Sequence, residues 1–408
     1  MVLIDLDTAG PAAPADRPPA RHARRWWGAA LALAVVALAT LDLRPLPDLR
    51  PIALLPPGTM RIVTAGDAFY VLRGNGSLAW NVSAYAWRDG TERWRRPLAG
   101  PDPDVVTAGA AVYVTHQQCD PQHAPSVDRL DPATGRPAWQ APGALVAGRA
   151  ATGGVVLLAR DTTGCGPARS ATELAGVAHT DGSPQWTLHF PQPRTITAAA
   201  DWFAAIAADG TTDTYTTATG THLASGTVPP SGTAAVTAGD VLVVVTGRRL
   251  STFDRSTLTP GWASDLNTAP STVESCGPLL CITENAVVTA VDPLVGELRW
   301  QHPALGRSVP GPSYVIGTTD TGVRLFAWSD GRIIADLPHW QLRPAGTGPT
   351  EVALQHEDRD RVTVALADLT TGTVRTVGRL PGFQTSCITG PHRLACIDPT
   401  GTTRLWPT

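Results

Sequence analysis

The chain has 408 residues, a formal net charge of −3 and 16% charged residues, with 39 Gly and 37 Pro. Soluble domains usually carry about one quarter charged residues, and a nearly neutral chain offers no basic field for nucleic acid, so we exclude nucleic-acid partners. All 32 basic residues are Arg. The absence of Lys excludes Schiff-base chemistry and the lysine-dependent phosphate sites of P-loops and kinases.

The N-terminal region predicts a membrane anchor. Residues 1–25 combine Asp, Pro and Arg, and we expect them to form a disordered cytoplasmic tail. Residues 26–43 begin with 16 uncharged residues, Trp26 to Leu41, directly after Arg24 and Arg25. At about 1.5 Å per residue this run is slightly shorter than the ~30 Å hydrocarbon core, but flanking Trp and Arg can lie at the interface. We therefore expect a transmembrane signal-anchor helix with the C-terminal domain outside the cytoplasm.

Two alternatives remain open for this segment. Ala37 and Ala39 supply a small-residue pattern at which a signal peptide can be cleaved. The run is also short enough for a buried helix of a cytoplasmic protein. Residues 44–58 are rich in Pro and cannot continue a helix, so we expect them to form a linker.

From residue 59 to residue 408 one pattern recurs: a β-rich run, an Asp, a short turn that contains Gly, and often a Trp four residues after the Gly. Weaker copies include FDRSTLTPGW, with Asp254, Gly261 and Trp262. With 13 Trp in 408 residues, the eight positions after the turn glycines should hold about a quarter of a Trp by chance, but four of them hold one. The pattern is therefore a repeat. Its complete copies are Asp89, Gly90, Trp94; Asp131, Gly135, Trp139; Asp181, Gly182, Trp186; and Asp292, Gly296, Trp300.

The spacing of the repeat predicts an all-β β-propeller. The turn glycines recur about every 40 residues, which is the length of one four-stranded blade. Gly accepts positive φ and Asp bonds to the turn backbone, as hairpin connections require. A four-stranded sheet cannot bury both faces alone, so we expect successive sheets to stack around an axis with the Trp residues between them. We expect eight blades, with seven or nine as alternatives, and residues 52–56 could complete the last sheet. A solenoid of hairpins is the other architecture, but it needs end caps that we do not find.

The Asp-x-x-Thr-Gly-x-x-x-Trp repeat resembles that of the PQQ-like, or quinoprotein alcohol dehydrogenase-like, β-propellers, over residues 59–408. The enzymatic branch of that family implies a calcium-bound quinone (PQQ), a catalytic Asp and often a disulfide between adjacent cysteines. This chain has no adjacent cysteines, and residues 59–408 build the blades and little else. We therefore assign no catalytic, cofactor-binding or metal-ligating residues and predict no cofactor.

The six cysteines are placed in pairs that match the repeat. Cys276 and Cys281 flank one expected turn between strands, and Cys387 and Cys396 flank the corresponding turn of the last repeat. Cys119 and Cys165 lie in comparable loops of the second and third repeats. Three local disulfides, and hence an oxidising compartment, are the interpretation we favour over six reduced thiols.

These observations favour a membrane-anchored extracytoplasmic β-propeller that acts as a non-catalytic binding or scaffold module in the bacterial cell envelope. The resemblance implies as partner another envelope protein, or a cell-wall ligand. The alternative is a dehydrogenase-like oxidoreductase that depends on PQQ and calcium. A propeller hydrolase or lyase acting on glycans also remains open, because such enzymes carry no short motif.

Overall fold

The runs of Val, Ala and Thr between the glycine turns fold as antiparallel strands, as β-branched and small residues on a pleated surface favour. The computed structural model describes residues 46–74, 79–98, 103–108, 110–116, 125–146, 154–163, 170–230, 234–285, 287–303, 308–311, 313–343, 351–358, 361–382 and 384–408. Within these ranges the regular secondary structure is all strand, and no helix is suited to crossing a membrane. The expected tail and anchor, residues 1–43, lie outside the described residues.

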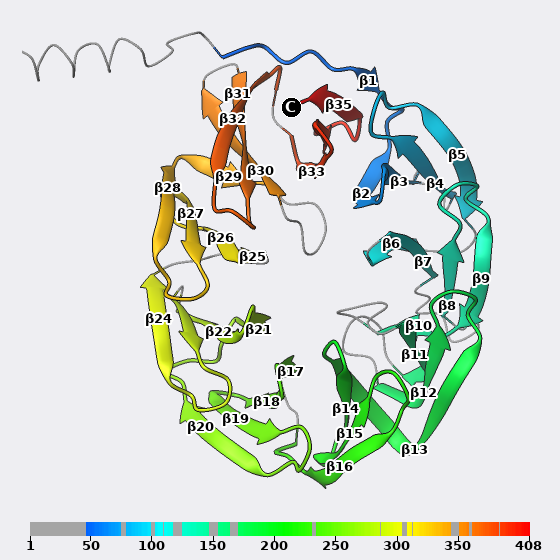
Figure 1. Ribbon diagram of the computed structural model, residues 1–408, viewed down its shortest axis with the longest axis vertical. Helices are drawn as coiled ribbons and strands as arrows, with labels where there is room; N and C mark the ends of the chain where they lie inside the picture. Colours follow the sequence, from blue (N-terminus) through cyan, green and yellow to red (C-terminus); the bar gives the residue numbers. More distant parts are fainter. Residues whose placement is uncertain are drawn as a thin grey trace, which may run out of the picture. The chain divides into compact units, whose positions relative to one another are not determined.

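Most sheets are meanders of four consecutive strands, each paired antiparallel to the next. In Figure 1 the first strand lies at the inner edge of the ring and the last at the outer edge, as is seen for β2 to β5, β6 to β9, β17 to β20 and β21 to β24. The six sheets of consecutive strands are β2 to β5 (Thr59–Ala65, Ala68–Gly74, Trp80–Ala86, Glu92–Leu98), β6 to β9 (Pro103–Ala108, Ala111–His116, Ser126–Leu130, Pro137–Pro142), β17 to β20 (Ala234–Ala238, Val241–Thr246, Arg249–Asp254, Pro260–Asp265), β21 to β24 (Thr272–Cys276, Leu279–Glu284, Val287–Val291, Leu298–Pro303), β25 to β28 (Ser308–Pro310, Tyr314–Thr318, Gly322–Ala327, Ile333–Pro338) and β29 to β32 (Trp340–Leu342, Glu351–Asp358, Arg361–Asp368, Val374–Leu380).

A longer sheet of seven strands joins two meanders through β13 (Pro184–Ala198). The first part of β13 pairs mainly with β12 as the last strand of one meander. Its final residues, Arg194 to Ala198, pair with β14 as the first strand of the next meander. The other strands are β10 (Ala144–Leu145), β11 (Val155–Thr163), β12 (Ser170–Ala178), β14 (Trp202–Ala207), β15 (Thr211–Thr216) and β16 (His222–Thr227).

The last sheet combines strands from both ends of the described chain. It contains β33 (Ser386–Gly390), β34 (Arg393–Ile397), β35 (Thr403–Pro407) and, next to β35, the N-terminal β1 (Ala53–Leu54). The expectation that residues 52–56 complete the last sheet is therefore confirmed. The compact unit begins at Pro47, inside the segment expected as a linker, and Leu49 donates its N–H to the carbonyl of Arg379 on β32.

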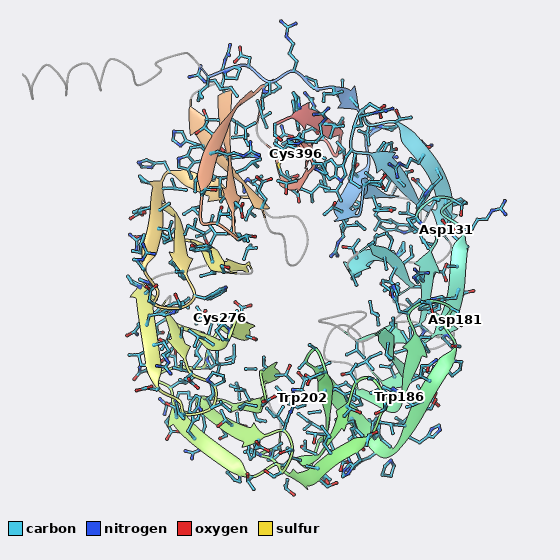
Figure 2. All side chains as sticks on the ribbon, in the orientation of Figure 1. Asp131, Asp181, Trp186, Trp202, Cys276 and Cys396 are labelled. Carbon is cyan, nitrogen blue, oxygen red and sulfur yellow. A yellow bond between two sulfur atoms is a disulfide. The ribbon has the colours of Figure 1, made fainter. Side chains whose placement is uncertain are left out.

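Apolar side chains fill the spaces between successive meanders. In the described part of the chain, nine hydrophobic clusters each contain residues of two neighbouring meanders. One of them joins the last sheet to the first, through Ile388 and Leu405 on one side and Phe69 and Val71 on the other. The sheets of the Pro47–Thr408 unit thus form a closed ring, and Figure 2 shows the side chains between neighbouring sheets. Closure removes the open end that a solenoid would have to cap.

In the described part of the chain, five Trp residues each link one meander to the turn of the next. Trp94 on β5 donates its Nε1–H to the carbonyl of Pro132, 2.9 Å away in the turn between β8 and β9. The same bond runs from Trp139 to His179 (3.0 Å) and from Trp300 to Trp328 (2.8 Å). Each indole also lies against the glycine of the turn that it bonds, leaving no room for a Cβ. The turn glycine is thus required twice, because its φ is positive and because the indole occupies the space beside it.

The fifth complete meander departs from the pattern at the turn between β19 and β20. The residue with positive φ there is Leu258 (φ 52), whose N–H donates to the carbonyl of Asp254, so Leu258 and not the expected Gly261 holds the turn position. In the preceding meander the position four residues after Gly220 is Ala224 instead of Trp. Leu258 and Ala224 are buried in one cluster. A larger residue in the turn therefore occupies the space that the missing indole leaves.

Alanine at Gly296 should destabilise the protein more than alanine at Gly239. Both glycines have positive φ, so both substitutions should cost about 1–2 kcal/mol of unfolding free energy from the backbone. A Cβ at Gly239 meets nothing within 4 Å, but one at Gly296 would lie 2.5 Å from the Trp262 ring, and displacing that ring should cost a further ~1–3 kcal/mol. Urea unfolding of the two variants measures the difference, and equal losses would contradict the packing role.

Exchange of Leu258 and Ala224 should show strong coupling. Ala224→Trp alone should overpack the cluster and cost about 1–3 kcal/mol, because Leu258 already fills the space. Adding Leu258→Gly should restore the indole-on-glycine contact of the other turns. The double variant should therefore be more stable than the sum of the single effects by more than ~0.5 kcal/mol, measured by a double-mutant cycle. Additive effects would show that the two positions are independent.

Candidate functional site

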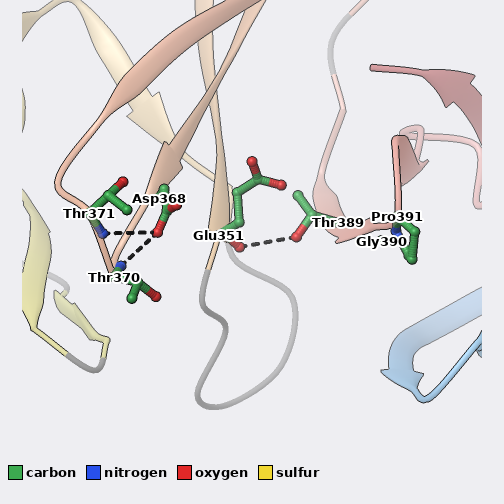
Figure 3. Close-up of a pocket in the computed structure, with 7 residues that line it drawn as sticks. All are labelled: Glu351, Asp368, Thr370, Thr371, Thr389, Gly390 and Pro391. Carbon is green, nitrogen blue, oxygen red and sulfur yellow. Dashed lines mark hydrogen bonds between the residues drawn. The ribbon is translucent and has the colours of Figure 1, made fainter.

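Two hollows flank the hairpin turn between β33 and β34, formed by Gly390 to Arg393. The first, here called the acidic pocket, has a volume of about 540 Å³ and is shown in Figure 3. The second, here called the seam groove, has a volume of about 720 Å³ and lies where the last sheet meets the first. Pro391 lines both. The acidic pocket is lined by Glu351, Asp368, Thr370, Thr371, Thr389, Gly390 and Pro391, and the seam groove by Asp67, Ala86, Trp87, Arg88, Asp89, Thr91, Glu92, Arg93, Pro391, His392 and Arg393.

The two carboxylates that line the acidic pocket accept hydrogen bonds from other groups of the protein. Asp368 accepts hydrogen bonds from the N–H groups of Thr370 (2.7 Å) and Thr371 (3.2 Å). Burial raises the pKa of Asp368, but these hydrogen bonds outweigh it and hold the pKa below its ordinary value. Glu351 accepts a hydrogen bond from Arg375 at 3.2 Å. Among the described residues, no three His, Cys, Asp or Glu side chains gather as a metal site would require.

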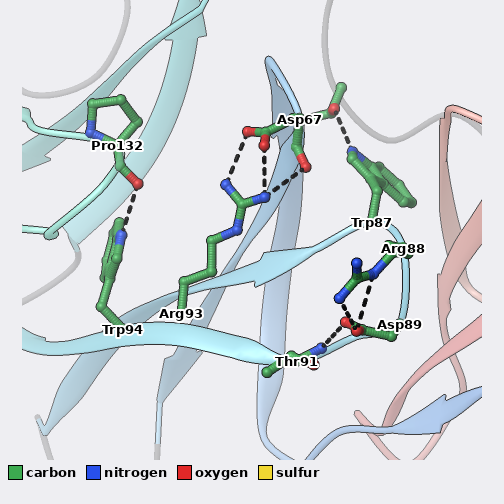
Figure 4. A network of polar contacts seen from close by, with 9 residues as sticks. Asp67, Trp87, Arg88, Asp89, Thr91, Arg93, Trp94 and Pro132 are labelled. Carbon is green, nitrogen blue, oxygen red and sulfur yellow. Dashed lines mark hydrogen bonds and ion pairs between the residues drawn. The ribbon is translucent and has the colours of Figure 1, made fainter.

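Ion pairs line the seam groove, and Figure 4 shows those of Arg93 with Asp67 and of Arg88 with Asp89. Arg93 binds Asp67 through both terminal nitrogens, at 2.9 and 2.6 Å, and this hydrogen bonding lowers the pKa of Asp67. Hydrogen bonds from Thr91, with a smaller contribution from Arg88, lower the pKa of Asp89 to about 2. These carboxylates are therefore ionised and paired near neutral pH.

A buried polar network extends from the groove into the first sheet. Glu92 accepts hydrogen bonds from Arg95 and from the hydroxyl of Tyr85, both at 2.7 Å. Burial raises the pKa of Glu92, but these two hydrogen bonds outweigh it, so the pKa lies below its ordinary value. The Tyr85 hydroxyl in turn accepts a hydrogen bond from the buried Arg73 at 2.8 Å. The hydrogen bonds from Arg73 to Tyr85 and from Tyr85 to Glu92 therefore fix the position of the Glu92 carboxylate.

The hairpin turn between the two hollows is fixed to the first sheet. Arg393 donates from Nε (3.2 Å) and Nη2 (3.1 Å) to the carbonyl of Arg88, and from Nη1 (2.8 Å) to the carbonyl of His392. His392 has positive φ (55°), and its carbonyl also accepts the N–H of Thr408. The ring of Trp87 lies against Gly390, where any Cβ would collide with it. This turn therefore holds one wall of the groove in a defined position.

One cluster on the outer strands has the residue types of a hydrolase site but a different geometry. Ser225 Oγ lies 2.8 Å from His222 Nε2 and donates to Asp213 Oδ1 at 2.5 Å. In a catalytic triad the imidazole lies between the other two groups, with the carboxylate on Nδ1. Here Asp213 contacts the Ser directly and approaches the same His nitrogen at 3.6 Å. Asp213 also lies 3.5 Å from Arg194, which is 4% exposed, so it compensates a buried guanidinium.

The sequence-predicted residues fall into structural roles. Cys276–Cys281 and Cys387–Cys396 are disulfide-bonded, the first bridging β21 and β22 and the second β33 and β34. Cys119 and Cys165 lie outside the described residues. Of the twelve repeat residues, Asp89 lines one of these two hollows and the other eleven line neither. The turn expected between Cys387 and Cys396 is present as Gly390 to Arg393, but sequence reasoning did not predict that it would line the two hollows.

Acid should destabilise the ring through the turn aspartates. Asp398 is 6% exposed, and although burial raises its pKa, hydrogen bonds from Thr400 and Thr402 and the charge of Arg404 outweigh burial and lower it. Such an aspartate takes up its proton at higher pH in the unfolded chain than in the folded one. Its contribution is therefore complete above the unfolded value of 3.8 and is lost as the pH falls through the folded value.

We expect the urea midpoint to change little from about pH 7 to 5 through these groups and to fall below about pH 4. Asp398→Asn keeps an acceptor for the turn N–H groups but cannot titrate, so the variant should be less stable at neutral pH and lose less stability in acid. An acid slope identical to that of the wild type would contradict this role.

A family model described as outer membrane protein assembly factor BamB, a PQQ-like β-propeller family, matches residues 55–141 and 124–408, and the chain belongs to this family. Among solved structures, BamB from Moraxella catarrhalis is 15% identical and covers 89% of this chain and 98% of its own, with a TM-score of 0.42. The computationally designed protein Ika8 is 14% identical over 88% and 98% of the two chains (TM-score 0.45). The C-terminal WD40 domain of Sif2 is 11% identical over 89% and 99% (TM-score 0.44). Among curated proteins, none matches the sequence significantly.

Proposed function

We propose that this PQQ-like propeller is a non-catalytic binding or scaffold module of the bacterial cell envelope and that it holds a protein partner at the seam of its ring. The proposal rests on the seam groove, a hollow of about 720 Å³. Its walls are held in position by hydrogen bonds and ion pairs. A volume of this size falls within the range of ligand sites. The partner class comes from the family, whose model is described as an outer membrane protein assembly factor.

The chemistry of the groove suits binding better than catalysis. Its carboxylates are each paired with a guanidinium: Asp67 with Arg93, Asp89 with Arg88, and Glu92 with Arg95. Paired carboxylates with lowered pKa values are poor general bases, because a base works best when its pKa lies near the operating pH. The same carboxylates and guanidiniums place negative and positive charges at fixed positions in the groove, and a partner with complementary charges would be favoured.

The proposed location is outside the cytoplasm, next to the membrane. Two disulfides within hairpins support an oxidising compartment. We keep residues 26–43 as the proposed single-pass anchor, with residues 1–25 in the cytoplasm. We also propose that each of the nine meanders separated by hydrophobic clusters is one blade, so the count is nine instead of the expected eight.

The PQQ and calcium alternative gains no support from the described residues. A calcium-bound quinone needs several oxygen ligands around one position. Among the described residues, no three His, Cys, Asp or Glu side chains gather in one place. We derive no catalytic step through the cofactor.

Site-specific photo-crosslinking in intact cells tests the function. The exposed Pro391, between the two hollows, is replaced by p-benzoylphenylalanine, and the control carries the same residue at Leu294, which is 64% exposed on another turn. We expect a discrete protein adduct from position 391 and none from position 294. No adduct at 391, or the same adducts at both positions, would contradict partner binding at the seam.

The same cells test the location. Free thiols are alkylated before lysis, and the peptides are mapped without reduction. We expect Cys276 linked to Cys281 and Cys387 linked to Cys396, as in the structure. Alkylated cysteines at these positions would contradict an oxidising compartment.

A further inference from the structure

We propose that the seam groove binds an acidic side chain, Asp or Glu, in an extended segment of the protein partner, and that Arg393 receives its carboxylate. This inference rests on the proposed function and specifies its ligand. The groove lies between the β33–β34 turn and the β4–β5 turn, so residues from the two ends of the ring form its opposite walls.

The charges of the groove leave one guanidinium without a counter-charge. The three lining carboxylates are each paired with Arg88, Arg93 or Arg95. In the described part of the chain, Arg393 has no carboxylate within ion-pair distance and donates its hydrogen bonds to the carbonyls of Arg88 and His392. The lining itself holds three carboxylates and three guanidiniums. Because Glu92 pairs with Arg95, which lies outside the lining, Arg393 is the one lining guanidinium without a carboxylate partner.

The guanidinium of Arg393 is also oriented in advance. A guanidinium has five N–H donors, and the bonds to the two carbonyls use three of them. The remaining two belong to Nη1 and Nη2, the nitrogens that bind a carboxylate through two parallel bonds. Since the backbone already holds the side chain, a ligand would not have to order it, and this strengthens binding.

The surroundings favour a carboxylate over a phosphate and a peptide over a free anion. A phosphate carries nearly two negative charges, and the three carboxylates of the lining would repel it more strongly than a singly charged carboxylate. Ala86 and the edge of Trp87 give the groove an apolar part. Trp87 is 3% exposed and held by a hydrogen bond from Nε1 to Thr64 at 3.3 Å, so this part is rigid. An aliphatic residue next to the acid would lie there.

Two matched peptides test the inference: acetyl-Leu-Glu-Leu-amide and acetyl-Leu-Gln-Leu-amide. Binding is followed on full-length protein labelled with ¹⁵N at arginine, and the Nε signal of Arg393 is assigned by its loss in Arg393→Gln. We expect the Glu peptide to shift this signal saturably and to bind roughly tenfold or more tightly than the Gln peptide. Equal binding of the two peptides, or no shift of the Arg393 signal, would overturn the proposal.

Variants separate binding from folding. Arg393→Gln should abolish the preference for Glu, but it also removes bonds that hold the turn. His392→Asp keeps those bonds and places a competing carboxylate beside Arg393, so it should weaken the Glu peptide roughly tenfold, whereas His392→Asn should not. Arg299→Gln, an exposed arginine on β24, should bind as the wild type does. Unchanged affinity in His392→Asp would overturn the proposal.

The two levels of the hypothesis fail differently. If position 391 still forms a discrete adduct in cells but the peptides do not discriminate, the carboxylate recognition is wrong and the proposed function stands. If the adduct is also absent, the proposed function fails.

Discussion

The contact on which the ring depends is the indole of one sheet lying on the turn glycine of the next. It combines burial of a large aromatic ring with a hydrogen bond from Nε1 to a turn carbonyl, so at the five described interfaces that have it one sheet is both packed against and oriented by its neighbour. The hydrogen bond and the packing of the indole both depend on the turn glycine. The turn must have positive φ to present its carbonyl, and it must lack a Cβ to admit the indole.

A ring built from local meanders must still close, and closure makes one interface different from the others. Here β1 joins the last sheet and Thr403 donates a hydrogen bond to Thr59 at 2.9 Å, so both ends of the unit meet at the seam. The terminal turn, Gly390 to Arg393, contacts the first sheet through the Trp87 ring on Gly390 and also through guanidinium-to-carbonyl bonds from Arg393 to Arg88. A hollow with charged walls lies beside these contacts, and it is the candidate site.

Much of the fold followed from the sequence because its determinants are local. The Asp-Gly turns, the strand runs between them and the cysteine pairs at 276/281 and 387/396 all concern residues close in the chain. The predicted turn residue was wrong where the turn position with positive φ holds a residue other than glycine. At the turn after β19, Gly261 was the obvious candidate, but Leu258 has the positive φ because Ala224, in the sheet before it, makes room. That compensation involves two sheets and has no signature in either segment alone.

The candidate site depends on contacts between residues that are much farther apart in the sequence. Arg88 and Arg393 are more than 300 residues apart, and nothing in their neighbours in the sequence shows that the guanidinium of one binds the carbonyl of the other. By itself the sequence determined the repeat, the all-β class and the family, since turn chemistry and hydrophobic periodicity act over a few residues. Only the tertiary structure decided that β13 serves two meanders, which residues close the ring and which guanidinium is left without a carboxylate, because pairing across the seam depends on where the whole ring brings its ends together.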